Sequence, residues 1–126
     1  MPPTNYEFID LNYLNMVAGD DLQTRATLLD LVAKEILDII PQLSVYYSGQ
    51  AWGDIKDHVH RMKTTLAFAG NADMSAANSQ IWKALVAMEA PESIGPMIHV
   101  LEANYQQVAR ELQTELHLMT DDLGRL

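Results

Sequence analysis

Two of the chain's four histidines stand one residue apart in the stretch DHVHRMKTTLAFAG, residues 57–70. On a helix that turns about 100° per residue, His58 and His60 lie about 200° apart around the axis. Two ligands on one helix hold a single metal ion only when they are three or four residues apart, so this pair does not form a zinc site. The chain has no cysteine, and no other histidine has metal-ligand spacing. We therefore expect no metal centre.

The two histidines differ in what surrounds them. The apolar positions of residues 51–69 place His60 about 140° from the core direction, whereas His58 lies on the flank of the core. Lys63, Thr64 and Ala67 follow His60 on the same face. A neutral imidazole is a nucleophile near pH 7, and a phosphoryl group added to His60 would bring negative charge beside the Lys63 ammonium. On this spacing alone, an ordinary solvent-exposed histidine is the simpler interpretation.

Apolar residues recur at helical spacing almost throughout the chain, and no alternation typical of strands competes. We predict a short helix over LNYLNMVA, residues 11–18, capped by Asp10 and stopped by Gly19. A long helix follows over residues 21–48, with a possible capping box from Asp20 and Gln23 and a kink at Pro41. Further helices are predicted over about 51–69 and 72–89, and a last one has Pro96 in its first turn.

The predicted inward positions define one core. They are Leu11, Leu14 and Val17; Leu22, Ala26, Leu29, Ala33, Ile36, Ile40, Leu43 and Tyr47; Ile55, Val59, Met62, Leu66 and Ala69; Met74, Ala77, Ile81, Leu85 and Met88; and Met97, Leu101, Tyr105, Val108, Leu112, Leu116 and Met119. Long amphipathic helices joined by short turns predict an all-α fold, an antiparallel four-helix bundle with a short extra N-terminal helix. At 126 residues, the chain is expected to form a single domain, 1–126.

Composition limits the partners. The formal net charge of −9 makes binding to nucleic acid or to an anionic membrane unfavourable. With no signal peptide, no membrane-spanning run and no cysteine, we expect a cytoplasmic protein. Of only eight lysine and arginine residues, Lys56, Arg61 and Lys63 all lie within a few positions of His60.

The segment HRMKTTLAFAG resembles the histidine-containing phosphotransfer (HPt) domain family. That family has a histidine, a lysine three residues later, a glycine directly after the lysine, and a second glycine ten residues after the histidine; His60, Lys63 and Gly70 match. The segment EILDIIPQL resembles the family's acidic-apolar-proline segment, and the order of helices agrees over nearly the whole chain. The family's fold is an antiparallel four-helix bundle.

The resemblance implies a phosphorelay in which His60 accepts a phosphoryl group from one receiver-domain aspartate and passes it to another, while Lys63 stabilises it. The expected partners are the receiver domains of a hybrid histidine kinase and of a response regulator. The chain would be a carrier, not an enzyme with its own kinase domain, and a monomer. It would need no cofactor of its own, because the receiver supplies the magnesium. The residues expected to contact a partner are Lys56, Arg61, Thr64, Ala67, Phe68 and Lys83.

The chain departs from the family at two positions. Thr64 replaces the first glycine, which lets the receiver backbone approach closely. Near the place where many members have a Gln or Glu that holds the other imidazole nitrogen, this chain has Trp82, with Gln80 two residues earlier. A tryptophan can donate a hydrogen bond but cannot accept one, and partial core packing is the favoured interpretation of Trp82.

Several assignments stay open at this stage. Phe68 is either part of a docking patch or a singly exposed apolar residue, and Lys83 is either part of a basic rim or a solvated charge. His99 and His117 are expected at the surface or at the boundary of the core. For the whole chain, two alternatives remain: a module that binds or sequesters a receiver without transfer, and an unrelated helical-bundle scaffold.

Overall fold

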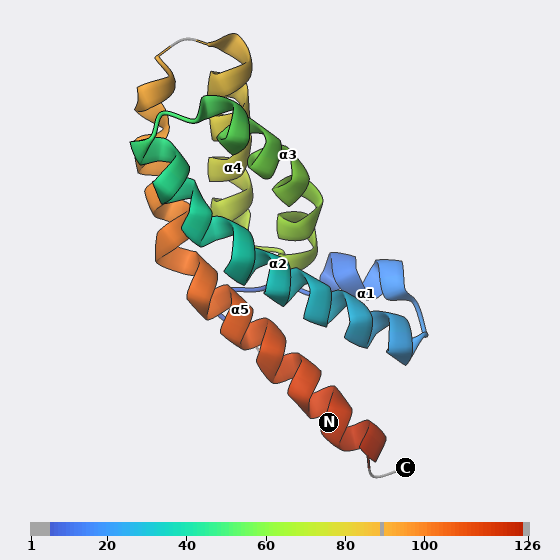
Figure 1. The fold of residues 1–126 in the computed structure, drawn as a ribbon. Helices are drawn as coiled ribbons and strands as arrows, with labels where there is room; N and C mark the ends of the chain where they lie inside the picture. Colours follow the sequence, from blue (N-terminus) through green and yellow to red (C-terminus); the bar gives the residue numbers. More distant parts are fainter. Residues whose placement is uncertain (1–5, 89, 125–126) are drawn as a thin grey trace.

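The computed structural model describes residues 6–88 and 90–124, with side chains as far as residue 121. Within these ranges the chain is all-helical and contains no strand (Figure 1). The elements are α1 (Asn12–Ala18), α2 (Leu22–Ser48), α3 (Trp52–Ala69), α4 (Ala72–Ala87), a short 3₁₀ helix η1 (Pro91–Ile94) and α5 (Gly95–Gly124).

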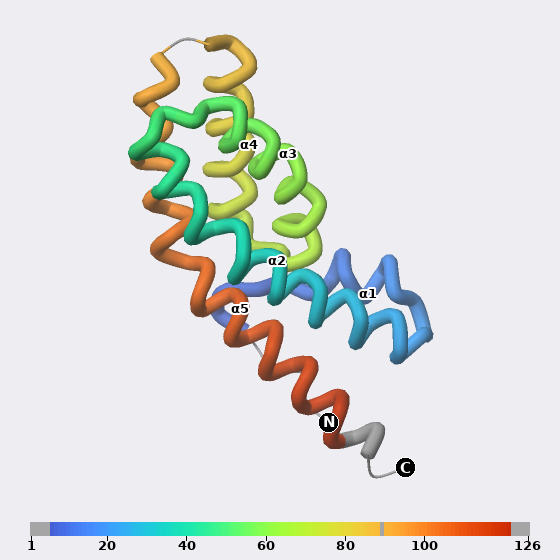
Figure 2. Tube along the Cα trace, viewed as in Figure 1, coloured from blue at the N-terminus to red at the C-terminus, as the bar shows by residue number. Residues whose placement is uncertain are grey.

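The long helices pack around one core. α2 packs against α3 and α5, and α4 packs against the same two helices, while α1 lies on α2 and α3. In Figure 2, the C-terminal end of α5 extends beyond α3 and α4. The largest fully buried side chains come from α1 to α4; they are Leu14, Leu29, Ile36, Ile39, Ile40, Leu43, Ile55, Met62, Leu66, Met74, Ile81 and Leu85. α5 adds Leu101, Val108 and Leu112 to the same core.

Three predicted inward positions are wrong. Val17 is 48% exposed because α1 turns Leu14 and Ala18 toward the core instead. Leu22 is 53% exposed because it is the first residue of α2, next to an exposed turn. Met88 is 64% exposed because α4 ends at Ala87, so the buried stripe stops one turn earlier than predicted. The predicted end of this helix at residue 89 lies outside the described residues.

The N-terminal caps differ from the predicted ones. Asp21, not Asp20, caps α2: its Oδ1 accepts hydrogen bonds from the backbone N–H groups of Gln23 at 3.0 Å and Thr24 at 3.2 Å. Leu11, not Asp10, is the N-cap of α1, although Asp10 Oδ1 accepts a hydrogen bond from the backbone N–H of Asn12 at 2.9 Å. α2 continues through Pro41 to Ser48, as the in-phase apolar stripe predicts.

Gly70 joins α3 to the N-terminal segment. Its φ of +72° is left-handed, and a Cβ added there would collide with the carbonyl oxygen of Asp10. The close approach allows Asp10 N to donate to Ala69 O at 3.0 Å, and Asn71 Nδ2 donates to Phe8 O at 2.9 Å. Gly70 therefore has a structural reason to be glycine that does not involve the histidines.

The N-terminal segment is also fastened to α5. One carboxylate, that of Glu111, accepts hydrogen bonds from the backbone N–H groups of Glu7, Phe8 and Ile9 at 3.2, 2.8 and 3.1 Å. These bonds satisfy donors that precede any helix. The segment thus reaches from α5 to the end of α3, where it meets Gly70.

Gly70→Ala should destabilise the protein. A left-handed alanine costs about 1–2 kcal/mol, and the clash with Asp10 adds to that cost. The free energy of unfolding in urea measures the effect. Gly53→Ala is the matched control, since a Cβ at Gly53 meets nothing within 4 Å and alanine in a helix is favoured by about 0.5–1 kcal/mol. Equal stability of the two variants would contradict the role given to Gly70.

The stability of the fold should depend on pH through the carboxyl group of Asp21. The hydrogen bonds from Thr24, its backbone N–H first and its hydroxyl second, hold the pKa of the Asp21 carboxyl below its ordinary value of 3.8. A lowered pKa stabilises the fold above the unfolded pKa, and this contribution disappears as pH falls through the folded pKa. Asp21→Ala should therefore be less stable than wild type at neutral pH, with a difference that narrows below about pH 4. Thermal unfolding across pH tests this, with Asp20→Ala as the control expected to show no such narrowing.

Candidate functional site

α3 divides the candidate residues between the core and the surface. Val59 and Met62 are fully buried, and they anchor the helix. His60 and Lys63 are exposed, one turn apart on the opposite side, as predicted. The helix ends cleanly because Gly70 is left-handed and its N–H donates to Leu66 O at 3.0 Å. The exposed face therefore presents an imidazole next to an ammonium.

His58 occupies a different environment. It is half-buried, and its Nδ1 lies 2.7 Å from the carbonyl oxygen of Asp54, so this nitrogen carries the proton and donates. Its ring also lies against Tyr46 of α2, with ring centroids 5.0 Å apart. These contacts make His58 part of the α2–α3 packing, on the flank of the core as predicted.

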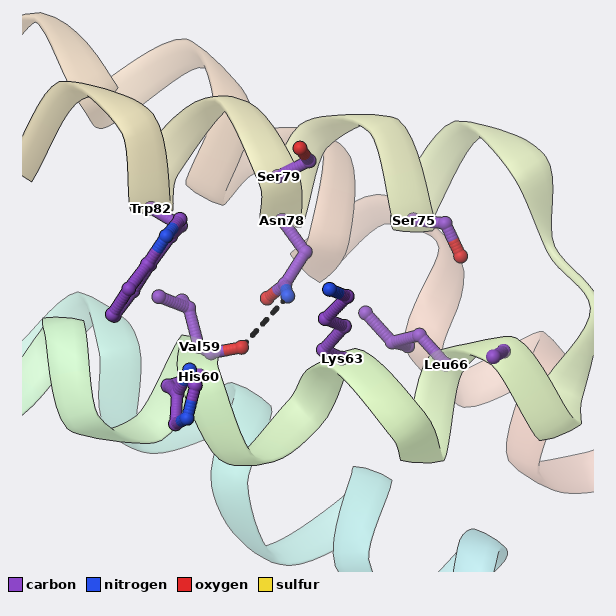
Figure 3. Close-up of a pocket in the computed structure, with 9 residues that line it drawn as sticks. Val59, His60, Lys63, Leu66, Ser75, Asn78, Ser79 and Trp82 are labelled. Carbon is purple, nitrogen blue, oxygen red and sulfur yellow. Dashed lines mark hydrogen bonds between the residues drawn. The ribbon is translucent and has the colours of Figure 1, made fainter.

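A hollow of about 330 Å³ lies between α3 and α4, with His60 among the residues that line it (Figure 3). α3 and α4 both supply its lining residues, which are Val59, His60, Lys63, Leu66, Ala67, Ser75, Asn78, Ser79 and Trp82. His60 and Trp82 lie toward one end of the close-up and Leu66 and Ser75 toward the other (Figure 3). The helical pattern could not reveal this hollow, since it depends on how α4 is rotated against α3.

Trp82 contacts the candidate nucleophile directly. Its indole stacks on the His60 imidazole, with centroids 4.8 Å apart and planes inclined by 30°. Lys56, on α3 one turn before His60, places its Nζ 5.6 Å from the centroid of the indole. Trp82 is half-buried and packs against the core, as expected, and it also contacts His60.

Neither ring nitrogen of His60 forms a hydrogen bond with the part of the chain that the structure describes. Gln80, the other candidate for holding the imidazole, is exposed. Lys63 forms no ion pair with any described residue. The imidazole nitrogens and the lysine ammonium, both on exposed residues, thus have no polar partner among the described residues.

Asn78 is a site residue that the sequence analysis missed. It is only 4% exposed, and its Nδ2 donates to the carbonyl oxygen of Val59 at 2.8 Å, directly before His60 (Figure 3). Its Oδ1 is buried without a hydrogen-bond partner among the described residues. The only signal in the sequence was that this asparagine directly follows Ala77, a predicted inward position. The bond fixes α4 against α3 beside the candidate nucleophile.

The remaining predicted contact residues are distributed more widely. Ala67 is exposed on the His60 face and lines the hollow. Thr64, on the same face, is exposed but does not line the hollow, and neither do the exposed Arg61 and Lys83. Phe68 is half-buried, because α1 covers it: its ring stacks on Tyr13 with centroids 5.2 Å apart. The expected outward Phe68 is therefore partly an internal contact of the fold.

The other two histidines are at the surface, as predicted. His99 and His117 are exposed, and His117 Nε2 lies 3.7 Å from a carboxylate oxygen of Asp121. In the described ranges, no three His, Cys, Asp or Glu side chains gather closely enough to hold a metal ion. None of the described helices combines the length and apolarity needed to cross a membrane.

No protein-family model matches the chain, and comparisons with curated proteins and with solved structures likewise find no match.

His60 should react faster than His58 with diethyl pyrocarbonate, which acylates neutral imidazole nitrogens. His60 is exposed and forms no hydrogen bond with any described residue, whereas His58 is half-buried and its Nδ1 donates to Asp54 O. Site-resolved mass spectrometry should show a several-fold difference in rate, with exposed His99 as the internal reference. Equal rates at His58 and His60 would contradict the geometry described here.

Proposed function

We propose that this chain is a histidine phosphotransfer protein of a multistep phosphorelay, with His60 as the phosphoacceptor. The observation that carries the proposal is an exposed imidazole whose nitrogens form no hydrogen bond with any described residue, with the unpaired ammonium of Lys63 one turn away. The sequence pattern of His60, Lys63 and Gly70 supports the same assignment. The family resemblance remains the source of the receiver-domain partners.

The chemistry is a phosphoryl transfer between an aspartate and a histidine. The lone pair of one neutral imidazole nitrogen attacks the phosphorus of a receiver's aspartyl phosphate, and the bond between phosphorus and the carboxylate oxygen breaks. The carboxylate leaves with that electron pair. The phosphorylated ring, momentarily cationic, releases the proton of its other nitrogen to solvent. Attack by a second receiver's aspartate reverses these steps. Lys63 stabilises the charge on the phosphoryl oxygens.

The fold suits this role. With α2 and α4 each packed against both α3 and α5, we assign the four long helices to an antiparallel four-helix bundle, with α1 as the extra N-terminal helix. A bundle of this kind holds α3 rigidly while leaving one face free for a partner. We propose that the domain spans residues 1–126 and acts as a monomer in the cytoplasm.

The charge distribution suits a receiver. Lys56 and Lys63 lie on the His60 side of an otherwise acidic chain of net charge −9. Receiver active sites are acidic, so these cations would favour docking there over docking elsewhere. The receiver would contribute its aspartate and its magnesium ion, and this chain would act as a carrier without its own kinase activity.

One observation favours a second function. Thr64 is exposed on the His60 face, where the family's glycine admits the receiver backbone. If its side chain blocks productive docking, the chain binds or sequesters a receiver without transfer. An unrelated scaffold, the third possibility, predicts neither binding nor transfer.

Incubation with phosphorylated receiver domains separates these functions. We expect an acid-labile, alkali-stable phosphate on the wild type, lost in His60→Gln and kept in His58→Gln, the matched control. Lys63→Ala should slow transfer about tenfold or more, as expected for the loss of one charge-assisted interaction. Binding without transfer, with transfer gained in Thr64→Gly, would select the sequestering module. If the chain neither binds nor accepts phosphate from any receiver domain encoded in the same genome, the proposal is overturned.

A further inference from the structure

Two side chains of α3 contact the indole of Trp82. His60 stacks on it at 4.8 Å, and Lys56, one helical turn earlier, places its Nζ 5.6 Å from the same ring. Trp82 itself comes from α4 and is half-buried. Its position is therefore set by packing, and the indole forms a fixed surface against which the imidazole rests.

We propose that Trp82 is the positioning residue of the phosphoacceptor: it fixes the plane of the His60 imidazole by stacking and stabilises the positive charge that the ring gains during attack. This inference rests on the proposed phosphotransfer function. In this proposal a stacking contact orients the His60 imidazole, in place of a side chain that would hold the ring by a hydrogen bond.

Stacking is compatible with nucleophilic attack. The lone pair of an imidazole nitrogen lies in the plane of the ring, so a partner on the ring face leaves both nitrogens open. A side chain that holds the imidazole by a hydrogen bond uses one nitrogen and fixes the tautomer. His60 receives no such bond from any described residue, and the stacked indole restrains the ring instead. Either nitrogen of His60 can then face an incoming phosphoryl group.

The indole also interacts differently with the reactant and with the phosphorylated ring. As the bond between nitrogen and phosphorus forms, the imidazole changes from neutral to cationic before it releases its proton. The face of an indole ring carries negative potential and attracts a cation stacked on it. Because this attraction grows along the reaction, it stabilises the transition state more than the unreacted imidazole and so lowers the barrier to transfer.

The test compares two substitutions of similar bulk. Trp82→Phe keeps an aromatic face, whereas Trp82→Leu keeps apolar volume without one. The single-turnover rate at saturating phosphorylated receiver should fall about 3- to 30-fold in Trp82→Leu, the range expected for one cation–π contact, and should be largely retained in Trp82→Phe. Receiver affinity should be unchanged in both variants. Trp52→Leu is the control, because Trp52 packs edge-on against Tyr47, with centroids 5.7 Å apart, and does not line the hollow.

A second measurement does not require phosphotransfer. NMR relaxation and NOEs report the order of the His60 side chain and its contact with residue 82 in the unphosphorylated protein. We expect an ordered imidazole in wild type and Trp82→Phe and a mobile one in Trp82→Leu. Wild-type order or a wild-type transfer rate in Trp82→Leu would overturn the inference. A wild type that accepts no phosphoryl group would overturn the proposed function, and the order of the imidazole would still decide whether Trp82 positions it.

Discussion

α3 has to bury one stripe of side chains against α2 and α4 while it exposes another, and the candidate site is a consequence of that division. Val59 and Met62 are inaccessible to solvent, and His60 and Lys63 stand on the other side of the same turns. The period of the α-helix makes the two sets inseparable, since rotation that buried His60 would expose Val59. Burial of the core stripe is thus what orients the imidazole outward.

Contacts in the middle of α3 and at its C-terminal end refine this arrangement. Near His60, the buried amide of Asn78 donates to the Val59 carbonyl and fixes α4 in place, which brings Trp82 onto the imidazole. At the far end, Gly70 admits the Asp10 backbone, and α1 is held where Tyr13 covers Phe68. The glycine that matches the HPt pattern is explained by this packing, so its presence has a reason independent of phosphotransfer.

Much of the fold could be predicted from the chain alone. The apolar period located every long helix, and α2 and α3 end at Ser48 and Ala69, as predicted. Errors occurred at helix ends: Asp21 caps α2 in place of Asp20, and Val17 and Met88 are exposed. Ends are decided by which side chain reaches a free backbone N–H and by where neighbouring helices stop, and a periodic pattern carries neither kind of information.

The pair His58 and His60 shows, within the site, the same division between what the sequence predicts and what tertiary packing decides. Sequence by itself determined that they face different sides of one helix and that Lys63 accompanies His60, because both statements follow from rotation about a single axis. Only the tertiary structure decided that Trp82 stacks on His60, that Asn78 donates to the carbonyl of Val59, and that α1 covers Phe68. Those contacts join residues on different helices, and they depend on how each helix is rotated and shifted against its neighbours as the shared core fills.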